Sequence, residues 1–171
     1  MRPRGRKAKL SPLNEFYTAI GRFVLEWAGL EICLDLLLLR IRSKREATER
    51  KSKLPHQFAE KIAEIRSEAK ELDSAHRAAI TDLLDKISSY AETRHDFVHG
   101  GIIDHYIEQG IITATLARLL QPPRRPRRKP VKVTAPQITE ISDRIHGLGD
   151  RLLDIAGAPT GQRGGKDGAG A

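Results

Sequence analysis

The sequence is poor in cysteine and aromatic residues and contains no long apolar run. Cys33 is the only cysteine among 171 residues, which excludes an internal disulfide and a zinc site made of several cysteines. The longest apolar run, residues 30–39, is interrupted by Asp35 and is too short to span a bilayer. Residues 1–9 are basic but lead into no hydrophobic segment of the kind found in a secretory signal. We therefore expect a cytoplasmic protein that is not associated with a membrane.

The sequence also lacks the motifs of two common kinds of phosphate-binding site. The chain offers neither the clustered carboxylates of a two-metal nuclease nor a glycine-rich phosphate-binding loop. Apolar residues make up 39% and aromatic residues 5%, which is typical of a helical protein built on leucine, isoleucine and alanine. The length suits one domain with a core of its own. We expect no cofactor and no bound metal.

The net charge of +8 comes from two short segments that contain no acidic residue. Their basic residues are Arg2, Arg4, Arg6, Lys7 and Lys9, and Arg124, Arg125, Arg127, Arg128, Lys129 and Lys132. Without these eleven, 19 basic residues remain against 22 acidic ones, so the rest of the chain is mildly acidic. We expect both segments to bind RNA as flexible arms, through counterion release. A solvated linker and a solubilising arm are the alternative, which the composition supports equally.

The first predicted helix covers residues 12–42 and carries an unbroken apolar seam. Its positions follow one another in steps of four and three: Phe16, Ile20, Phe23, Trp27, Leu30, Leu34, Leu37 and Ile41. This is a heptad pattern held for nearly four repeats. Further apolar residues widen its C-terminal half, which we expect to be covered on more than one side. Such a seam fits a helical bundle, a dimer, or both.

Two more helices are predicted before residue 100. The second covers about residues 56–72 and the third residues 74–99, with Asp73 or Ser74 as the N-cap of the third. The break between them is short, so we expect an antiparallel helical hairpin.

After Gly100 the pattern changes from helical to β-rich. Isoleucine and threonine are concentrated in residues 101–107 and 111–120 around a glycine turn, which predicts a small β-hairpin. Residues 121–132 form a linker rich in proline and arginine. The stretch 134–137 then predicts a capping box, followed by the last helix to about residue 156.

The predicted fold class is all-α. We expect an up-and-down bundle of four to five helices, with a small β-hairpin inserted before the last helix. The helical domain covers residues 12–156. A basic flexible arm (1–11) precedes it and a disordered glycine-rich tail (157–171) follows it.

The segment 94–100, Arg-His-Asp-Phe-Val-His-Gly, ends the third predicted helix. The apolar stripe of that helix is Ile80, Leu84, Ile87 and Ala91, and its next positions are Arg94 and Val98. Arg94 therefore occupies a position that the pattern reserves for the core. Burying an unpaired guanidinium costs roughly several kcal/mol, because it cannot lose its proton. Arg94 must pair with an acid, face a cleft or bind an anion.

A purely structural interpretation of this segment stays open. A histidine in the last turn interacts favourably with the helix dipole, and glycine commonly ends helices in the left-handed conformation. This accounts for His99 and Gly100. It does not account for Arg94 on the apolar stripe, or for His95 and Asp96 beside it.

The residue types suit cleavage of RNA without a metal. Arginine offers a planar set of donors to a phosphate, and histidine exchanges protons near neutral pH. One histidine removes the proton of a ribose 2′-hydroxyl or protonates the leaving oxygen. The arginine stabilises the charge that develops on the phosphate.

A helical chain whose penultimate helix ends in arginine, four residues and histidine resembles the HEPN superfamily. The resemblance covers about residues 12–156, and its specific part is Arg94, His95 and His99. It implies that Arg94 and His99 are catalytic and that His95 assists, although the family commonly has asparagine at that position. Many members are endoribonucleases of toxin–antitoxin or phage-defence systems, which favours an antitoxin or a minimal nucleotidyltransferase as a partner. Others are inactive modules that bind nucleotides, nucleic acid or proteins, which is the alternative function.

The resemblance also implies a homodimer whose two motifs face each other across a composite site. The spacing agrees, because residues five apart lie about 140° apart around a helix. We therefore expect that Arg94 and His99 cannot hold one phosphate from one regular helix. Either the helix end unwinds or a second copy contributes. Asp96 and Glu31 are assigned as accessory residues, with Glu31 holding Arg94.

A zinc site is the rival interpretation of the two histidines. His95 and His99 are four residues apart, which suits two ligands of one zinc ion. Asp96, Asp104 and His105 are the candidates for further ligands. The glutamate that makes such a helix a hydrolase is absent between the two histidines.

Overall fold

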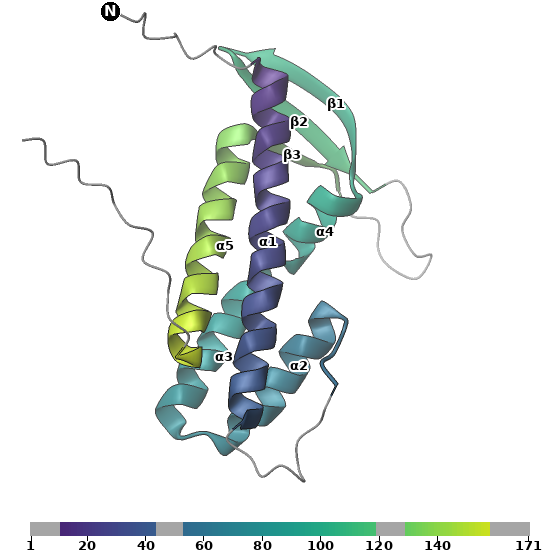
Figure 1. Cartoon of the computed structure of the whole chain (residues 1–171). Helices are drawn as coiled ribbons and strands as arrows, with labels where there is room; N and C mark the ends of the chain where they lie inside the picture. Colours follow the sequence, from purple (N-terminus) through teal and green to yellow (C-terminus); the bar gives the residue numbers. More distant parts are fainter. Residues whose placement is uncertain (1–10, 44–52, 119–128, 158–171) are drawn as a thin grey trace, which may run out of the picture.

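The computed structural model describes residues 11–43, 53–118 and 129–157 and shows a mostly helical chain with one small sheet (Figure 1). The elements are α1 (Pro12–Ser43), α2 (Phe58–Glu68), the 3-10 helix η2 (Ala69–Glu71), α3 (Ser74–Ser89), α4 (Ala91–His99), β1 (Gly101–Glu108), β2 (Ile111–Ala117), β3 (Val131–Thr134) and α5 (Ala135–Ala156). A mostly helical fold with a small β-structure before the last helix is therefore confirmed. The predicted N-terminal arm, apart from Ser11, and the predicted tail beyond Gly157 lie outside the described residues.

Helix α1 is the centre of the fold, and α5 lies beside it and runs in the same direction (Figure 1). The backbone N–H of Asn14 donates to Ser11 Oγ, which caps the start of α1. The predicted seam is the buried face of α1: Phe16, Phe23, Trp27, Leu30, Leu34, Leu37 and Ile41 are all buried, and Ile20 is half-buried. The heptad pattern thus predicted the helix and its inner face.

Helix α2 covers another flank of α1 and also runs in the same direction. Phe58 at its start contacts Trp27, and Lys61 one turn later donates to Asp35 at 2.6 Å. These contacts follow the same order along both helices. The strict up-and-down alternation that we expected is therefore not kept between α1 and α2, whereas α3 runs back in the opposite direction to α2, as predicted (Figure 1).

The third predicted helix is divided at Tyr90. Tyr90 ends α3 and begins α4, so the single helix expected to reach residue 99 is wrong. Because of this division, α4 buries a different face from the one that the apolar stripe of α3 predicts. Phe97 packs against Phe23 at 4.7 Å between ring centroids. Arg94 is only half-buried and Val98 is 40% exposed, in contrast to the predicted stripe.

The sheet has three antiparallel strands in the order β1-β2-β3. The predicted hairpin corresponds to β1 and β2, joined at Gln109 and Gly110, which both have positive φ as such tight turns require. Strand β3 was not predicted, and it includes the last two residues of the segment assigned to the linker. Residues of β2 and β3 that face the helices are buried: Ile112, Ala114, Leu116 and Val133. Strand β1 is the exposed edge.

Two helix starts confirm the capping residues predicted from the sequence. Asp73 accepts hydrogen bonds from the N–H groups of Ala75 and His76 at the start of α3. Thr134 and Gln137 form the predicted capping box of α5. In the described part of the chain, no helix combines the length and the apolar character needed to cross a membrane.

Gly100 joins α4 directly to β1, and its backbone is extended rather than left-handed, with φ −80° and ψ 143°. The left-handed cap on which the purely structural interpretation relied is therefore not formed. The glycine is required for another reason. A Cβ atom added here would lie 2.2 Å from the carbonyl oxygen of Asp96, which accepts the hydrogen bond of the Gly100 N–H. The tight passage from helix to strand leaves no room for a side chain.

Replacing Gly100 with alanine is expected to lower the free energy of unfolding by about 1–3 kcal/mol, because the backbone near Asp96 must shift. Gly147→Ala is the control, since an added Cβ at this exposed position of α5 meets no described atom within 4 Å. It should raise the free energy of unfolding by roughly 0.5–1 kcal/mol through helix propensity. Urea denaturation of both variants measures the difference. Equal stability of Gly100→Ala and the parent would contradict the steric explanation.

Candidate functional site

Arg94 and His99 contact each other at the end of α4. Arg94 Nη1 lies 3.3 Å from His99 Nε2, and the His99 ring is exposed to solvent. A guanidinium only donates hydrogen bonds, so His99 Nε2 accepts and the imidazole proton is on Nδ1. The two side chains therefore meet within one chain, whereas the expectation that they cannot hold one phosphate from one regular helix stays a prediction. The long arginine side chain reaches across the last turn to the histidine.

His95 lies beside this pair. The ring centroids of His95 and His99 are 4.6 Å apart, with an angle of 57° between the planes. Partial desolvation, then the positive charge of Arg118, and then that of His99 when its ring is protonated, lower the pKa of His95 below its ordinary value of 6.5. His95 is thus neutral at pH 7 and able to accept a proton or a hydrogen bond. The three residues of the sequence signature form one cluster at the surface.

Asp96, on the other side of the same turn, is held by Arg118 at the end of β2. Arg118 Nε donates to Asp96 Oδ1 at 2.7 Å, and both side chains are largely buried. Arg118 Nη2 also donates to the carboxylate of Glu92 at 2.9 Å and to the Glu92 carbonyl oxygen at 3.2 Å. One arginine therefore fixes two turns of α4 against the sheet. Asp96, which was assigned as an accessory residue, contacts Arg118.

Arg118 was missed by the sequence analysis, although a signal was present. It is the only charged residue in the apolar run 111–120, a position where an unpaired guanidinium is costly. An unpaired guanidinium buried at Arg118 would be as costly as one at Arg94. Of the two arginines, Arg118 is the one that pairs with acids, and its side chain is largely buried.

Glu31 does not hold Arg94. Its Oε1 accepts a hydrogen bond from Trp27 Nε1 at 2.7 Å, four residues earlier on α1. Within the part of the chain that the structure describes, no ion pair joins Glu31 to Arg94. The assignment rested on a buried Arg94 in need of an acid. Because α3 and α4 are separate helices, Arg94 is half-buried and does not need one.

The rival zinc site is not formed by the described residues. Across residues 11–43, 53–118 and 129–157, no three histidine, cysteine, aspartate or glutamate side chains make a group that could hold a metal ion. Asp96 is engaged by Arg118, as described above. Asp104 and His105 follow each other on the exposed strand β1, where successive side chains point to opposite faces.

The predicted RNA-binding arms fall mostly outside the described residues. This holds for Arg2, Arg4, Arg6, Arg124, Arg125, Arg127 and Arg128. Lys129 is described and is exposed just before β3. Lys132 belongs to β3 itself, where its Nζ lies 5.9 Å from the centroid of the Tyr106 ring, at the range of a cation–π contact.

Comparisons of this chain with protein-family models, with curated proteins and with solved structures find no match.

Replacing Arg118 with glutamine is expected to raise the pKa of His95 toward its ordinary value. The substitution removes a nearby positive charge, and the carboxylates of Glu92 and Asp96 are then less neutralised, so both effects favour protonated His95. An NMR titration of the His95 ring measures this pKa. In the parent protein the midpoint should lie below 6.5, so that His95 gains its proton only at more acidic pH. Arg151→Gln, an exposed arginine of α5, is the control and should leave the midpoint unchanged. An unchanged or lower midpoint in Arg118→Gln would contradict the account of His95.

Proposed function

We propose that this chain is a metal-independent endoribonuclease of HEPN type, with Arg94, His99 and His95 as its site. The single observation that supports the proposal most is the contact of Arg94 with His99 at an exposed helix end. The sequence motif by itself indicates the same residues. The guanidinium of Arg94 and the unprotonated Nε2 of His99 lie in direct contact, and together they form a suitable binding site for a phosphodiester.

The proposed chemistry uses the two histidines for proton transfer and the arginine for charge. A phosphate that enters between Arg94 and His99 takes over the guanidinium donors and frees His99 Nε2. One histidine then removes the proton of the ribose 2′-hydroxyl, whose oxygen attacks the phosphorus. The bond to the 5′-oxygen breaks, and the histidine that took the proton of the 2′-hydroxyl passes it to the leaving oxygen, so that both rings end neutral. Arg94 stabilises the negative charge on the phosphate oxygens in the transition state.

The lowered pKa of His95 assigns it an assisting role in this scheme. It is neutral at pH 7, so it accepts the proton of the 2′-hydroxyl or orients it. A second copy of the chain would bring a second Arg94–His99 pair, which is the composite site that the HEPN resemblance implies. The proposed setting is the cytoplasm, in a toxin–antitoxin or phage-defence system. An antitoxin or a minimal nucleotidyltransferase is the proposed partner.

Arg94→Ala and His99→Ala are each expected to reduce RNA cleavage by at least about 100-fold while leaving the fold intact. Arg94→Lys should also be impaired, because lysine keeps the charge but loses the planar pair of donors. The assay is cleavage of single-stranded RNA by the purified protein in the presence of a metal chelator. Induced expression in a bacterial host provides a second readout, in which growth arrest by the parent should vanish in His99→Ala.

The matched controls are one exposed histidine and one exposed arginine away from the site. His76 lies at the start of α3 and Arg144 is on α5. His76→Ala and Arg144→Ala should cleave RNA at the parent rate. If Arg94→Ala and His99→Ala cleave as fast as these controls, the site assignment is wrong.

A catalytically inactive module that binds nucleic acid, a nucleotide or a protein is the second candidate. The observation that favours it is the exposure of both histidines, because exposed groups gain less from the low dielectric that strengthens catalysis. Such a module would bind RNA without cutting it. Its affinity would depend on the basic segments, so neutralising residues 124–129 should flatten the salt dependence of RNA binding. An unchanged slope, together with no cleavage, would count against both candidates.

A further inference from the structure

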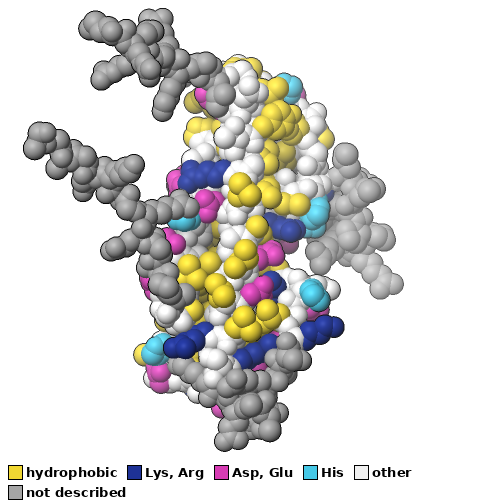
Figure 2. All heavy atoms as spheres, viewed as in Figure 1, with side chains coloured by type: hydrophobic (Ala, Val, Ile, Leu, Met, Phe, Trp, Pro, Cys, Tyr) yellow, Lys and Arg dark blue, Asp and Glu magenta, His cyan; other side chains and the backbone are white. Residues whose placement is uncertain are grey.

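The outer face of α1, opposite the buried seam, carries an exposed apolar stripe. Its bulky members are Leu25, Ile32, Leu36 and Leu39, with exposed fractions of 74%, 60%, 42% and 48%. Ala28 and Gly29 lie between them and are also exposed. Figure 2 shows hydrophobic side chains in a run down the middle of the molecule, where Figure 1 places α1 in front. Contiguous apolar surfaces of this kind mark interaction sites.

The stripe has the symmetry of a self-complementary surface. Leu25 and Leu39 each lie seven residues from Ile32, and Ala28 and Leu36 each lie four residues from it. Reversing the helix about Ile32 exchanges Leu25 with Leu39 and Ala28 with Leu36, so these apolar positions fall on apolar positions, whereas Gly29 falls on Asp35 at the edge of the stripe. An interface between two identical copies with twofold symmetry needs this property, because residue i must contact residue j and the reverse.

The small and large residues of the stripe distinguish the two possible directions. If two copies of α1 pair antiparallel about Ile32, Leu36 of one faces Ala28 of the other, and Leu25 faces Leu39. A parallel pair would place Leu36 against Leu36 and Ala28 against Ala28, which leaves a crowded end and an empty end. Close packing therefore favours the antiparallel pair.

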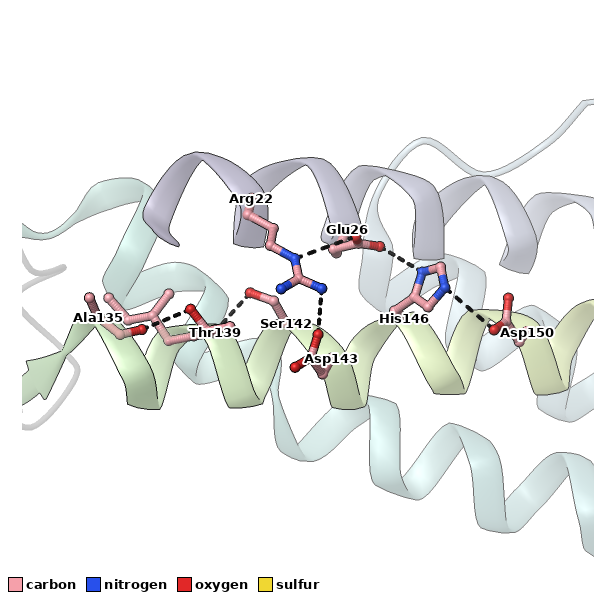
Figure 3. A network of polar contacts seen from close by, with 9 residues as sticks. Arg22, Glu26, Ala135, Thr139, Ser142, Asp143, His146 and Asp150 are labelled. Atoms are coloured by element: carbon pink, nitrogen blue, oxygen red, sulfur yellow. Dashed lines mark hydrogen bonds and ion pairs between the residues drawn. The ribbon is translucent and has the colours of Figure 1, made fainter. Parts of the chain in front are cut away.

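Three of the charged side chains that border the stripe are paired within the chain, and a fourth, Arg40, is exposed near its C-terminal end. On the α5 side, Arg22 pairs with Asp143, and Glu26 contacts His146 at 2.9 Å (Figure 3). On the α2 side, Asp35 pairs with Lys61 at 2.6 Å. The stripe itself contains no charged residue. Two copies can therefore approach along it with these three charges paired, provided that the exposed Arg40 stays in solvent at the edge of the contact.

Two glycines of this region have no role that the described structure explains. Gly21 and Gly29 lie inside α1, where glycine costs about 0.5–1 kcal/mol relative to alanine. No described atom lies within 4 Å of a Cβ added at either position. A helix that packs against this face from another molecule would come close to α1 at Gly29, next to the small Ala28.

We propose that α1 pairs with α1 of a second copy of this chain, antiparallel and with Ile32 on the twofold axis. The inference does not depend on the proposed ribonuclease, because association is measured without RNA. From Leu25 to Leu39 the stripe extends over about 21 Å of helix. This is a small contact compared with the roughly 800 Å² per partner of a standard interface. The dimer is therefore weak, and its population depends on protein concentration in the micromolar range.

Charge substitutions at Ile32 test the twofold axis. Ile32→Glu places two glutamates against each other and Ile32→Lys two lysines, so each variant alone should lose at least about 100-fold in association constant. An equimolar mixture of the two should associate again as a heterodimer, since a glutamate then meets a lysine. Sedimentation velocity over a range of concentrations measures all three samples. Because Ile32 is exposed, circular dichroism should show unchanged helix content.

Ile107→Glu is the matched control, since Ile107 is 58% exposed but lies on β1. It should associate like the parent. A parent that stays monomeric at all concentrations overturns the proposal. The proposal also fails if Ile32→Glu associates like the parent, or if Ile107→Glu is the variant that becomes monomeric.

Disulfide trapping tests the direction of the helices. In a background in which Cys33 is replaced by serine, Leu25→Cys and Leu39→Cys place one thiol at each end of the stripe. A mixture of the two should form the mixed disulfide, because only the antiparallel pair brings these Cα atoms within about 7 Å. Disulfides of each variant with itself would indicate a parallel pair and would contradict the proposal.

Discussion

The buried face of α1 is the constraint on which the rest of the structure depends. Its seam, from Phe16 to Ile41, is the surface against which α5, α2 and α4 pack. Phe23 is the contact for Phe97 on α4, and Trp27 is the contact for Phe58 on α2. The direction and position of the shorter helices follow from these aromatic contacts. A heptad pattern in one helix thus organises segments that are far apart in the sequence.

The candidate site follows from the way α4 is held between α1 and the sheet. Phe97 anchors one side of the helix in the core, and Asp96 pairs with Arg118 at the end of β2. With these two residues directed inward, the remaining side chains of the last turn, including His95 and His99, are left at the surface. Gly100 then turns the chain directly into β1. The exposure of the cluster is therefore a consequence of the packing of its neighbours.

The sequence predicted those features that depend on local pattern. The inner face of α1, the Asp73 cap, the Thr134–Gln137 capping box and the hairpin turn at Gly110 all have signals within a few residues. It did not predict the division at Tyr90, because the periodicity of α3 continues through it and only the tertiary contacts of Phe97 and Asp96 favour another face. Strand β3 and the pairing of Arg118 were missed for the same reason. Both depend on partners that are fifteen or more residues away.

We propose that the Arg94–His99 pair cleaves RNA without a metal, by attack of the ribose 2′-hydroxyl on the phosphorus. The chemical nature of the RNA ends tests it most directly. Labelled RNA is incubated with the purified protein in excess chelator, and the new ends are identified by mass spectrometry. The account predicts 5′-hydroxyl ends and 2′,3′-cyclic phosphates, absent with His99→Ala. Products with 5′-phosphate and 3′-hydroxyl ends, formed only when a divalent metal is added, would contradict it.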